Sequence, residues 1–181
     1  MIPTTLSPPQ DYEAKMRFVS ILSALFHEID FEHLTVKQIC EMAEVTRPTF
    51  YHYFHDKYEI VQWHSDLIAQ MGIFQIGRSL NWREGYFISL HGHFEHRLLY
   101  KNVAKVRGFQ ALSRYSERAR KENLVHTIVD HCHRELSKEL LFQVSALAIA
   151  ETTLAMRWMS DGFSESPSEM AELLESIVPK E

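Results

Sequence analysis

Residues 35–61 read TVKQICEMAEVTRPTFYHYFHDKYEIV, and this stretch decides the fold of the N-terminal part of the chain. Thr35 is a typical helix N-cap, and apolar residues repeat at helical spacing over 36–43. A second helix, 47–54, follows with Pro48 in its first turn, where a missing amide hydrogen costs nothing. The stretch therefore predicts two short helices joined by a tight turn, a helix-turn-helix.

The rest of the chain is predicted to be helical as well, because glycine and proline are sparse and strand-like alternation is hard to find. The predicted helices are 11–29, 36–43, 47–54, one that begins after Asp56, 82–99, 109–136, 139–160 and 168–178, with a short helix or loop at 101–108. The sequence thus predicts an all-α fold of about nine helices in total. We expect a flexible N-terminus at 1–10, a helix-turn-helix domain at 11–60 and a second helical domain at 61–181.

Composition limits the class of protein. The 181 residues are 45% hydrophobic, which is ample for a packed core. The two cysteines, Cys40 and Cys132, are far apart, so neither a disulfide framework nor a zinc ribbon is indicated. The N-terminus lacks the pattern of a signal peptide, and the most apolar stretch, 140–150, runs into Glu151. We expect a cytoplasmic protein with no membrane partner.

The segment 35–61 resembles the signature of the TetR family of transcriptional regulators in its turn, its TFYHYF run and the lysine that follows, Lys57. The resemblance covers about residues 14–63, and beyond them only the helical layout and the ending around Trp158 are similar. It implies an N-terminal three-helix DNA-binding domain followed by a helical ligand-binding and dimerisation domain. It also implies binding to a double-stranded DNA operator.

In this family the second short helix reads DNA. Arg47, at its start, has a planar fork that can bind a guanine edge at two points. Pro48 and His52 lie one turn apart on the same side, so contact with a thymine methyl and a hydrogen bond to a base fit them. Base contacts are therefore expected from these three residues. The residues expected to hold phosphates are Thr35, Thr49, Tyr51, Tyr53 and Lys57, the last together with the first amides of the following helix.

A structural role is the alternative for several of these residues. Tyr51 and Tyr53 could pack inward, and Thr35 could be only a cap. Phe50 and Phe54, four residues apart, are predicted to belong to the small core of the domain.

Two features depart from the family pattern. Glu44 stands in the turn where the family usually has glycine, and a non-glycine residue in a left-handed turn costs about 1 kcal/mol or more. Residues 11–60 hold nine Asp and Glu against five Lys and Arg, and the whole chain has a net charge of −5. Because phosphate neutralisation supplies most non-specific affinity, we expect modest, salt-dependent DNA binding.

The second domain is expected to bind an unknown small-molecule effector and to form a homodimer, as the resemblance implies. The aromatic residues expected to line a ligand pocket are Phe87, Phe94, Phe109 and Tyr115. The residues expected at the dimer interface are Leu147, Leu154, Trp158, Leu173, Leu174 and Ile177, with ordinary packing inside one subunit as the alternative. Histidines gather at 91–96 and 131–133, but residues two apart point to different sides of a helix, so no metal or other cofactor is expected.

The sequence therefore predicts a ligand-responsive transcriptional repressor that binds operator DNA as a homodimer. The rival hypothesis is a co-regulator of the same fold whose acidic head contacts a protein partner instead of DNA. An enzyme is not indicated, because the sequence contains no glycine-rich phosphate loop and no nucleophile elbow, and so no catalytic residue is named.

Overall fold

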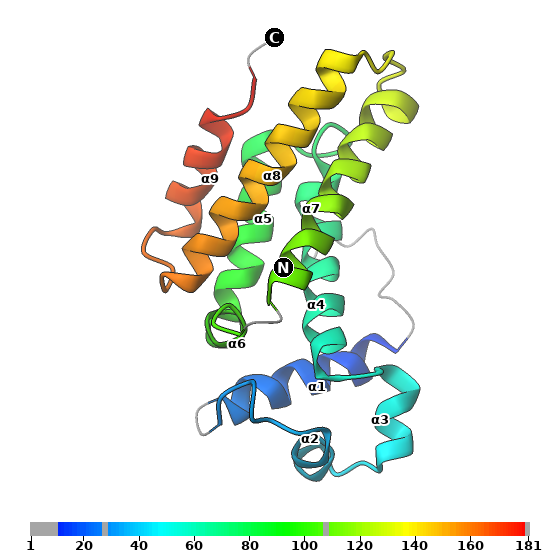
Figure 1. Cartoon of the computed structure of the whole chain (residues 1–181), viewed down its shortest axis with the longest axis vertical. Coiled ribbons are helices and arrows are strands. Elements are labelled where there is room, and N and C mark those ends of the chain that lie inside the picture. Colours follow the sequence, from blue (N-terminus) through cyan, green and yellow to red (C-terminus); the bar gives the residue numbers. More distant parts are fainter. Residues whose placement is uncertain (1–10, 27–28, 107–108, 180–181) are drawn as a thin grey trace. The chain divides into compact units, whose positions relative to one another are not determined.

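The computed structural model of the chain describes residues 11–26, 29–106 and 109–179, with the side chain of Phe109 outside the description. The predicted flexible segment 1–10 lies outside these residues. Within the described ranges the chain is all-helical, as predicted (Figure 1). The α-helices are α1 (Tyr12–Leu25), α2 (Val36–Ala43), α3 (Arg47–Tyr53), α4 (Lys57–Met71), α5 (Trp82–Glu95), α6 (Arg97–Val103), α7 (Phe109–His126), α8 (Lys138–Ser160) and α9 (Pro167–Ser176).

Three predicted helices differ clearly from the structure: the one predicted at 11–29 ends at Leu25, and two others are interrupted. The predicted helix 82–99 is divided into α5 and α6, because His96 leaves the helical conformation with φ −105° and ψ 31°. The predicted helix 109–136 ends as α7 at His126 and continues as a wider π-helical turn over Thr127–His131. Neither break coincides with a glycine or a proline, so the sequence carries no local signal for it.

The chain forms two compact units and passes from the first to the second within α4, between Leu67 and Ile68. We call the described part of the first unit, through Leu67, the head, and the second the C-terminal unit.

An aromatic cluster forms the core of the head. Phe18 of α1 meets Phe50 and Phe54 edge-on, with ring centroids 5.6 and 5.7 Å apart and planes at 90°. All three rings are buried, and Val19 and Leu22 of α1 are fully buried beside them. The predicted core role of Phe50 and Phe54 is confirmed, and their burial turns the opposite face of α3 towards solvent.

Hydrogen bonds fix α2 at both of its ends. Thr35 begins α2 with a capping box, in which its hydroxyl accepts from the Gln38 amide while the Gln38 side chain accepts from the Thr35 amide. At the other end Glu44 adopts the left-handed conformation, with φ 54° and ψ 39°. Arg17 of α1 donates to the carbonyl of Ala43 at 2.7 Å, just before this residue. The turn thus keeps its left-handed geometry although glutamate occupies it.

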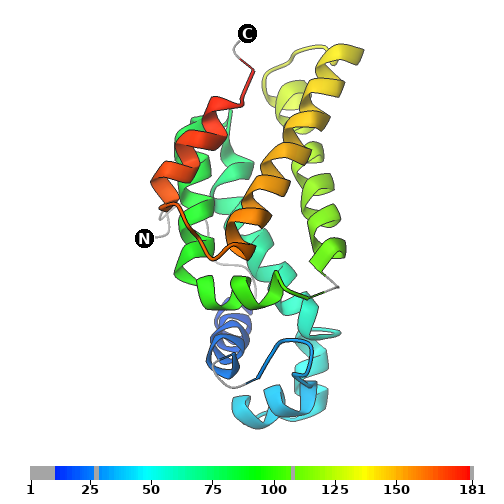
Figure 2. The same ribbon diagram turned by 60° about the vertical axis from the view of Figure 1, so that its left-hand side comes forward.

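In the C-terminal unit α5 packs against α9 and α7 against α8, while α6 runs across one end (Figures 1 and 2). A polar network is buried among these helices. Arg120 of α7 and Glu151 of α8 are only 1% and 5% exposed, and Arg120 Nε lies 2.6 Å from Glu151 Oε2. The Tyr86 hydroxyl of α5 donates to the same carboxylate. Burial, reinforced by the charge of Glu151, raises the pKa of Tyr86 well above its usual value.

The same arginine also fixes the segment that follows α4. Its Nη1 donates to the carbonyl of Ile73 at 2.7 Å and to the Asn123 side chain at 3.0 Å. Asn123 in turn donates to the carbonyl of Phe74 at 3.2 Å. The network therefore joins α5, α7 and α8 to the backbone at the end of α4.

We expect Arg120→Leu to lower the free energy of unfolding of the C-terminal unit by about 3–5 kcal/mol, because it leaves Glu151 charged and unpaired in the interior. Urea unfolding followed by circular dichroism measures the loss. The double variant Arg120→Leu/Glu151→Leu should recover a large part of it, since an apolar pair replaces the ion pair. Equal losses in the single and double variants would contradict this explanation.

We expect Glu44→Gly to raise the free energy of unfolding of the head by about 1 kcal/mol, because glycine adopts a positive φ without a Cβ penalty. Thermal unfolding of the full chain measures the change. Glu44→Gln is the matched control, since it removes the charge but keeps the Cβ, and it should stay close to wild type. A gain as large for glutamine as for glycine would assign the effect to charge instead.

Candidate nucleic-acid interface

The outward face of α3 carries all three residues predicted to read bases. Thr46 caps the helix by accepting from the Thr49 amide, and Pro48 lies in the first turn. Arg47, Pro48 and His52 are exposed, while Phe50 is buried. The burial of Phe50 turns Pro48 and His52, on the opposite side of the helix, to solvent, and Arg47 is exposed at the N-terminal end of the helix.

The residues predicted to hold phosphates have different surroundings. The Thr35 hydroxyl is engaged in its capping box, and the Thr49 hydroxyl shares a 2.9 Å hydrogen bond with Thr46. Tyr51 is 54% exposed, and its ring packs edge-on against the ring of Phe50. Tyr53 is half-buried and contacts the Phe18 ring at 6.0 Å, so both packing and exposure contribute at this position.

Lys57, the remaining predicted phosphate contact, holds the backbone of the head. Its Nζ donates to three carbonyls in the loop between α1 and α2, at 2.5 Å to Phe31, 3.0 Å to Glu32 and 2.7 Å to Leu34. Desolvation by burial lowers the pKa of this ammonium, although Glu32 and then Asp56 act in the opposite direction. Sequence reasoning missed this arrangement, because its partners lie 23 to 26 residues away and are backbone atoms.

The first turn of α4 is occupied by carboxylates of the chain itself. Asp56 Oδ1 accepts from the amides of Tyr58 and Glu59, at 2.8 and 2.9 Å. Glu59 Oε2 accepts from the His55 amide at 2.5 Å and lies 2.8 Å from His55 Nδ1. Desolvation by burial opposes ionisation of Glu59, but the hydrogen bonds from His55 outweigh it, so its pKa is lowered.

The residues predicted to line a ligand pocket have different surroundings in the described structure. Phe94 packs on Trp158 and Phe163, with ring centroids 6.5 and 5.7 Å away. Phe87 and Tyr115 are each 41% exposed, on α5 and α7. The side chain of Phe109 lies outside the described residues. A pocket lined by these residues stays a prediction.

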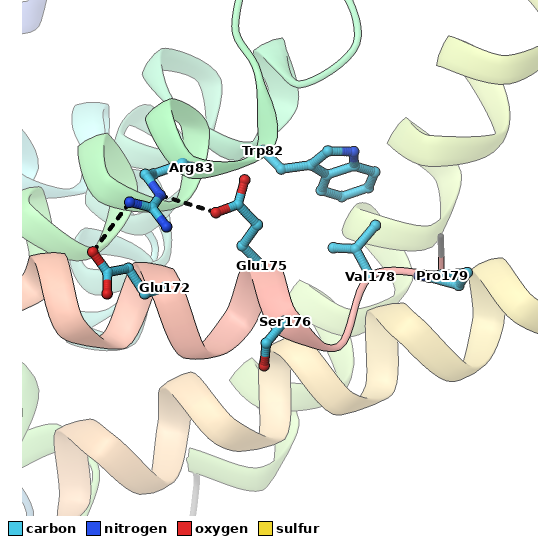
Figure 3. Close-up of a pocket in the computed structure, with 7 residues that line it drawn as sticks. All are labelled: Trp82, Arg83, Glu172, Glu175, Ser176, Val178 and Pro179. Carbon is cyan, nitrogen blue, oxygen red and sulfur yellow. Dashed lines mark hydrogen bonds and ion pairs between the residues drawn. The ribbon is translucent and has the colours of Figure 1, made fainter. Parts of the chain in front are cut away.

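An open pocket of about 470 Å³ lies elsewhere in the C-terminal unit, between the start of α5 and the end of α9 (Figure 3). Its lining residues are Trp82, Arg83, Glu172, Glu175, Ser176, Val178 and Pro179. Figure 3 shows Arg83 between two carboxylates, 3.1 Å from Glu172 and 2.9 Å from Glu175. Its charged groups thus pair with one another and tie α5 to α9.

The predicted interface residues divide into two sets. Leu147, Trp158 and Leu174 are 9%, 3% and 3% exposed, so they belong to the core of the subunit itself and leave the proposed interface. Helical periodicity could not separate the buried from the exposed residues of α8, because this helix is apolar on most sides. The exposed set consists of Leu154, Leu173 and Ile177, and the structure adds Phe142 and Ile149.

Among the described residues no group of three or more His, Cys, Asp and Glu side chains is placed to hold a metal ion. His93 illustrates why the histidine-rich segment does not form one. Its Nδ1 lies 2.7 Å from the carbonyl of Ser89, its ring meets Tyr100, and burial lowers its pKa to about 4.

Comparison with known proteins gives consistent matches along the chain. Residues 23–62 match the model for bacterial regulatory proteins of the tetR family, and residues 81–180 match a transcriptional regulator C-terminal region. The uncharacterized HTH-type transcriptional regulator YxbF of Bacillus subtilis (strain 168) is 36% identical over 63 residues. That similarity spans 35% of this chain and only 15% of YxbF.

Solved structures share the fold. The dihydroxyacetone kinase operon activator DhaS aligns with a TM-score of 0.63 at 16% identity, covering 91% of this chain and 95% of its own. A TetR-family regulator from Syntrophomonas wolfei has a TM-score of 0.62 at 17% identity, covering 92% and 93%. The two family models span the helix-turn-helix and more than half of the chain, and the solved structures agree with them. The chain therefore belongs to the TetR family of bacterial transcriptional regulators.

Proposed function

We propose that this TetR-type regulator binds operator DNA as a homodimer in the cytoplasm and is released by a small-molecule effector. The observation that carries the DNA-binding part is that Arg47, Pro48 and His52 of α3 are all exposed to solvent, while Phe50 anchors the helix in the core of the head. A helix that presents an arginine fork and two further side chains in this way fits the major groove.

Each exposed residue of α3 has a proposed partner on the duplex. Arg47 binds a guanine edge, Pro48 contacts a thymine methyl, and His52 donates to or accepts from a base. The proposed phosphate contacts are Thr35, Thr49, Tyr51 and Tyr53. Of these, Tyr51 is supported most directly, because its hydroxyl-bearing ring is 54% exposed beside the reading face.

The apolar surface of α8 and α9 supports the dimer. Phe142 and Ile149, seven residues apart on one side of α8, are 74% and 48% exposed. Leu173 and Ile177, four residues apart on α9, are 54% and 40% exposed. Exposed apolar side chains at these spacings fit burial against the same helices of a second copy.

The same apolar surface gives α8 the length and composition of a membrane span. Its most apolar 18-residue window has a mean hydropathy of 1.3, and 22% of that window is buried. Glu151, in the middle of the helix, is buried against Arg120 of α7, which fits a helix packed in a protein. We therefore propose a second copy of the chain, and not a lipid bilayer, as the partner of this surface.

Repression stays the predicted direction of regulation, although DhaS, a protein of the same fold, is named as an operon activator. A reporter gene placed behind the bound operator decides between the two. The sequence and the structure do not identify the effector. Its binding to the C-terminal unit is proposed to lower the affinity of the head for DNA, and the division of the chain into two units supports this coupling.

We expect Arg47→Gln to weaken operator binding by about 1–3 kcal/mol per half-site, because a bidentate guanine contact is lost. Mobility shift with genomic fragments selected by the wild-type protein measures the effect. Arg134→Gln is the matched control, since Arg134 is an exposed arginine of the C-terminal unit, and it should bind like wild type.

A wild-type protein that forms no specific complex at low salt with any genomic fragment would contradict the proposed operator binding. That result would favour the rival hypothesis of a head that contacts a protein partner. Loss of affinity in both arginine variants would indicate a general charge effect instead of base reading by Arg47.

We expect Ile149→Glu to shift the protein from dimer to monomer at micromolar concentration, because it places a charge in the proposed apolar interface. Size-exclusion chromatography with light scattering measures the mass. Gln143→Glu adds the same charge at an exposed position of the same helix and should stay dimeric. A wild-type monomer would contradict the dimer, and wild-type protein that floats with lipid vesicles would favour a membrane partner.

A further inference from the structure

The head is acidic, so the position of each of its few cations matters for DNA binding. Residues 11–60 contain five Lys and Arg against nine Asp and Glu. Affinity for the phosphate backbone comes from cations that are free to displace its counterions. A cation that is already held inside the protein supplies less of it. The structure describes the contacts of all five.

Three of the five cations make hydrogen bonds or cation–π contacts within the head, although the side chain of Arg17 is also exposed to solvent. Lys15 Nζ lies over the rings of Phe54 and Trp63, 5.4 and 5.5 Å from their centroids. Arg17 donates to the Ala43 carbonyl at 2.7 Å and thereby closes the end of α2. Lys57 is held most completely of the three.

The ammonium of Lys57 has three N–H groups and three carbonyl partners. All three carbonyls belong to the loop 31–34, with donor–acceptor distances of 2.5, 3.0 and 2.7 Å. Its Nζ also lies 4.9 Å from the centroid of the buried Phe31 ring. Contact with a phosphate would require the ammonium to give up hydrogen bonds to backbone carbonyls, which would then lose their donor.

This contact connects two helix starts. Lys57 is the first residue of α4, and the loop 31–34 leads directly into Thr35, the N-cap of α2. By binding the loop carbonyls, Lys57 fixes where α2 begins, and through the turn at Glu44 it fixes the position of α3. Its effect on DNA binding is therefore indirect.

The amides of the first turn of α4 do not replace it as a phosphate site. Asp56 accepts from two of them and Glu59 accepts from the His55 amide. Asp56 thus occupies the place that a phosphate takes at a helix N-terminus, and the carboxylate of Glu59 adds a second negative charge just before the helix. A DNA phosphate would be repelled by them, so this end of the head offers no anion site.

The other two cations of the head are Lys37 and Arg47. Lys37 lies on α2, its side chain is 69% exposed, and its Nζ lies 3.6 Å from the carboxylate of Glu41, which is 61% exposed. Such a surface pair is worth little and opens readily. Arg47 is exposed at the start of α3, and no hydrogen bond or ion pair holds it within the described part of the chain.

We propose that Lys57 is a positioning residue that holds the α1–α2 loop, and that the cationic contacts of the head with DNA are made by Lys37 and Arg47. The inference rests on the proposed operator-binding dimer. Because cations held within the head release fewer counterions, the logarithm of the binding constant should fall only gently with the logarithm of salt, and about −2 of that slope per dimer should come from the two copies of Lys37.

The test measures operator binding of the full chain by fluorescence anisotropy between 50 and 300 mM KCl, for wild type, Lys37→Met, Lys57→Met and the control Lys138→Met. Lys37→Met should flatten the slope by about 2 per dimer, one for each lost phosphate contact. Lys57→Met should weaken binding at every salt concentration but leave the slope unchanged. Lys138, on α8 in the C-terminal unit, should behave like wild type.

Lys57→Arg separates charge from position. It keeps the positive charge, but a planar fork does not match three carbonyls that converge on one ammonium. Positioning predicts weakened binding with the wild-type slope, whereas a phosphate contact predicts near wild-type affinity. Circular dichroism shows whether Lys57→Met folds. If it does not fold, the affinity and salt slope of Lys57→Arg still test the positioning role.

A slope that flattens by about 2 in Lys57→Met, or full affinity in Lys57→Arg, would overturn the positioning role. An unchanged slope in Lys37→Met would overturn the assignment of Lys37. Absence of any specific complex with the wild-type protein is a different outcome, because it contradicts the proposed function itself.

Discussion

Edge-on packing of Phe18 against Phe50 and Phe54 is the contact on which the reading face depends. α3 is only seven residues long, and a helix of this length has no stability of its own. Burying the two phenylalanines fixes its rotation, and the remaining surface then carries Arg47, Pro48 and His52. Hydrophobic burial on one side of α3 thus determines the chemistry on the other.

Polar contacts complete both units, and in each a cation binds groups of the protein itself. In the head Lys57 binds three loop carbonyls, and Arg17 closes the turn where Glu44 takes a left-handed conformation. In the C-terminal unit Arg120 pairs with Glu151 and also holds the Ile73 carbonyl after α4. Buried ion pairs contribute little net stability, but removing one partner is costly, so such contacts favour a single arrangement of the backbone.

The sequence predicted the local features well. The caps Thr35 and Thr46 and the repeated apolar positions located α2 and α3, and Pro48 marked the first turn of α3. Long-range partners left no such signal. Lys57 was expected to face DNA, and its real partners could not be predicted because they are backbone carbonyls more than 20 residues away. Leu147 was expected at an interface because α8 is apolar on most sides, so its sequence does not show which side is buried in the subunit.

Three of the five cations of the head contact groups within the head itself, and we propose that few remain to bind DNA phosphates. The most direct measurement is the ¹H–¹⁵N NMR signal of the Lys57 ammonium, assigned by its loss in Lys57→Met. Three hydrogen bonds should slow its exchange with water, so the signal should be visible in the free protein and unmoved by operator DNA, while a Lys37 signal should emerge only on binding. A Lys57 signal that is absent without DNA and emerges or shifts on binding would contradict the account.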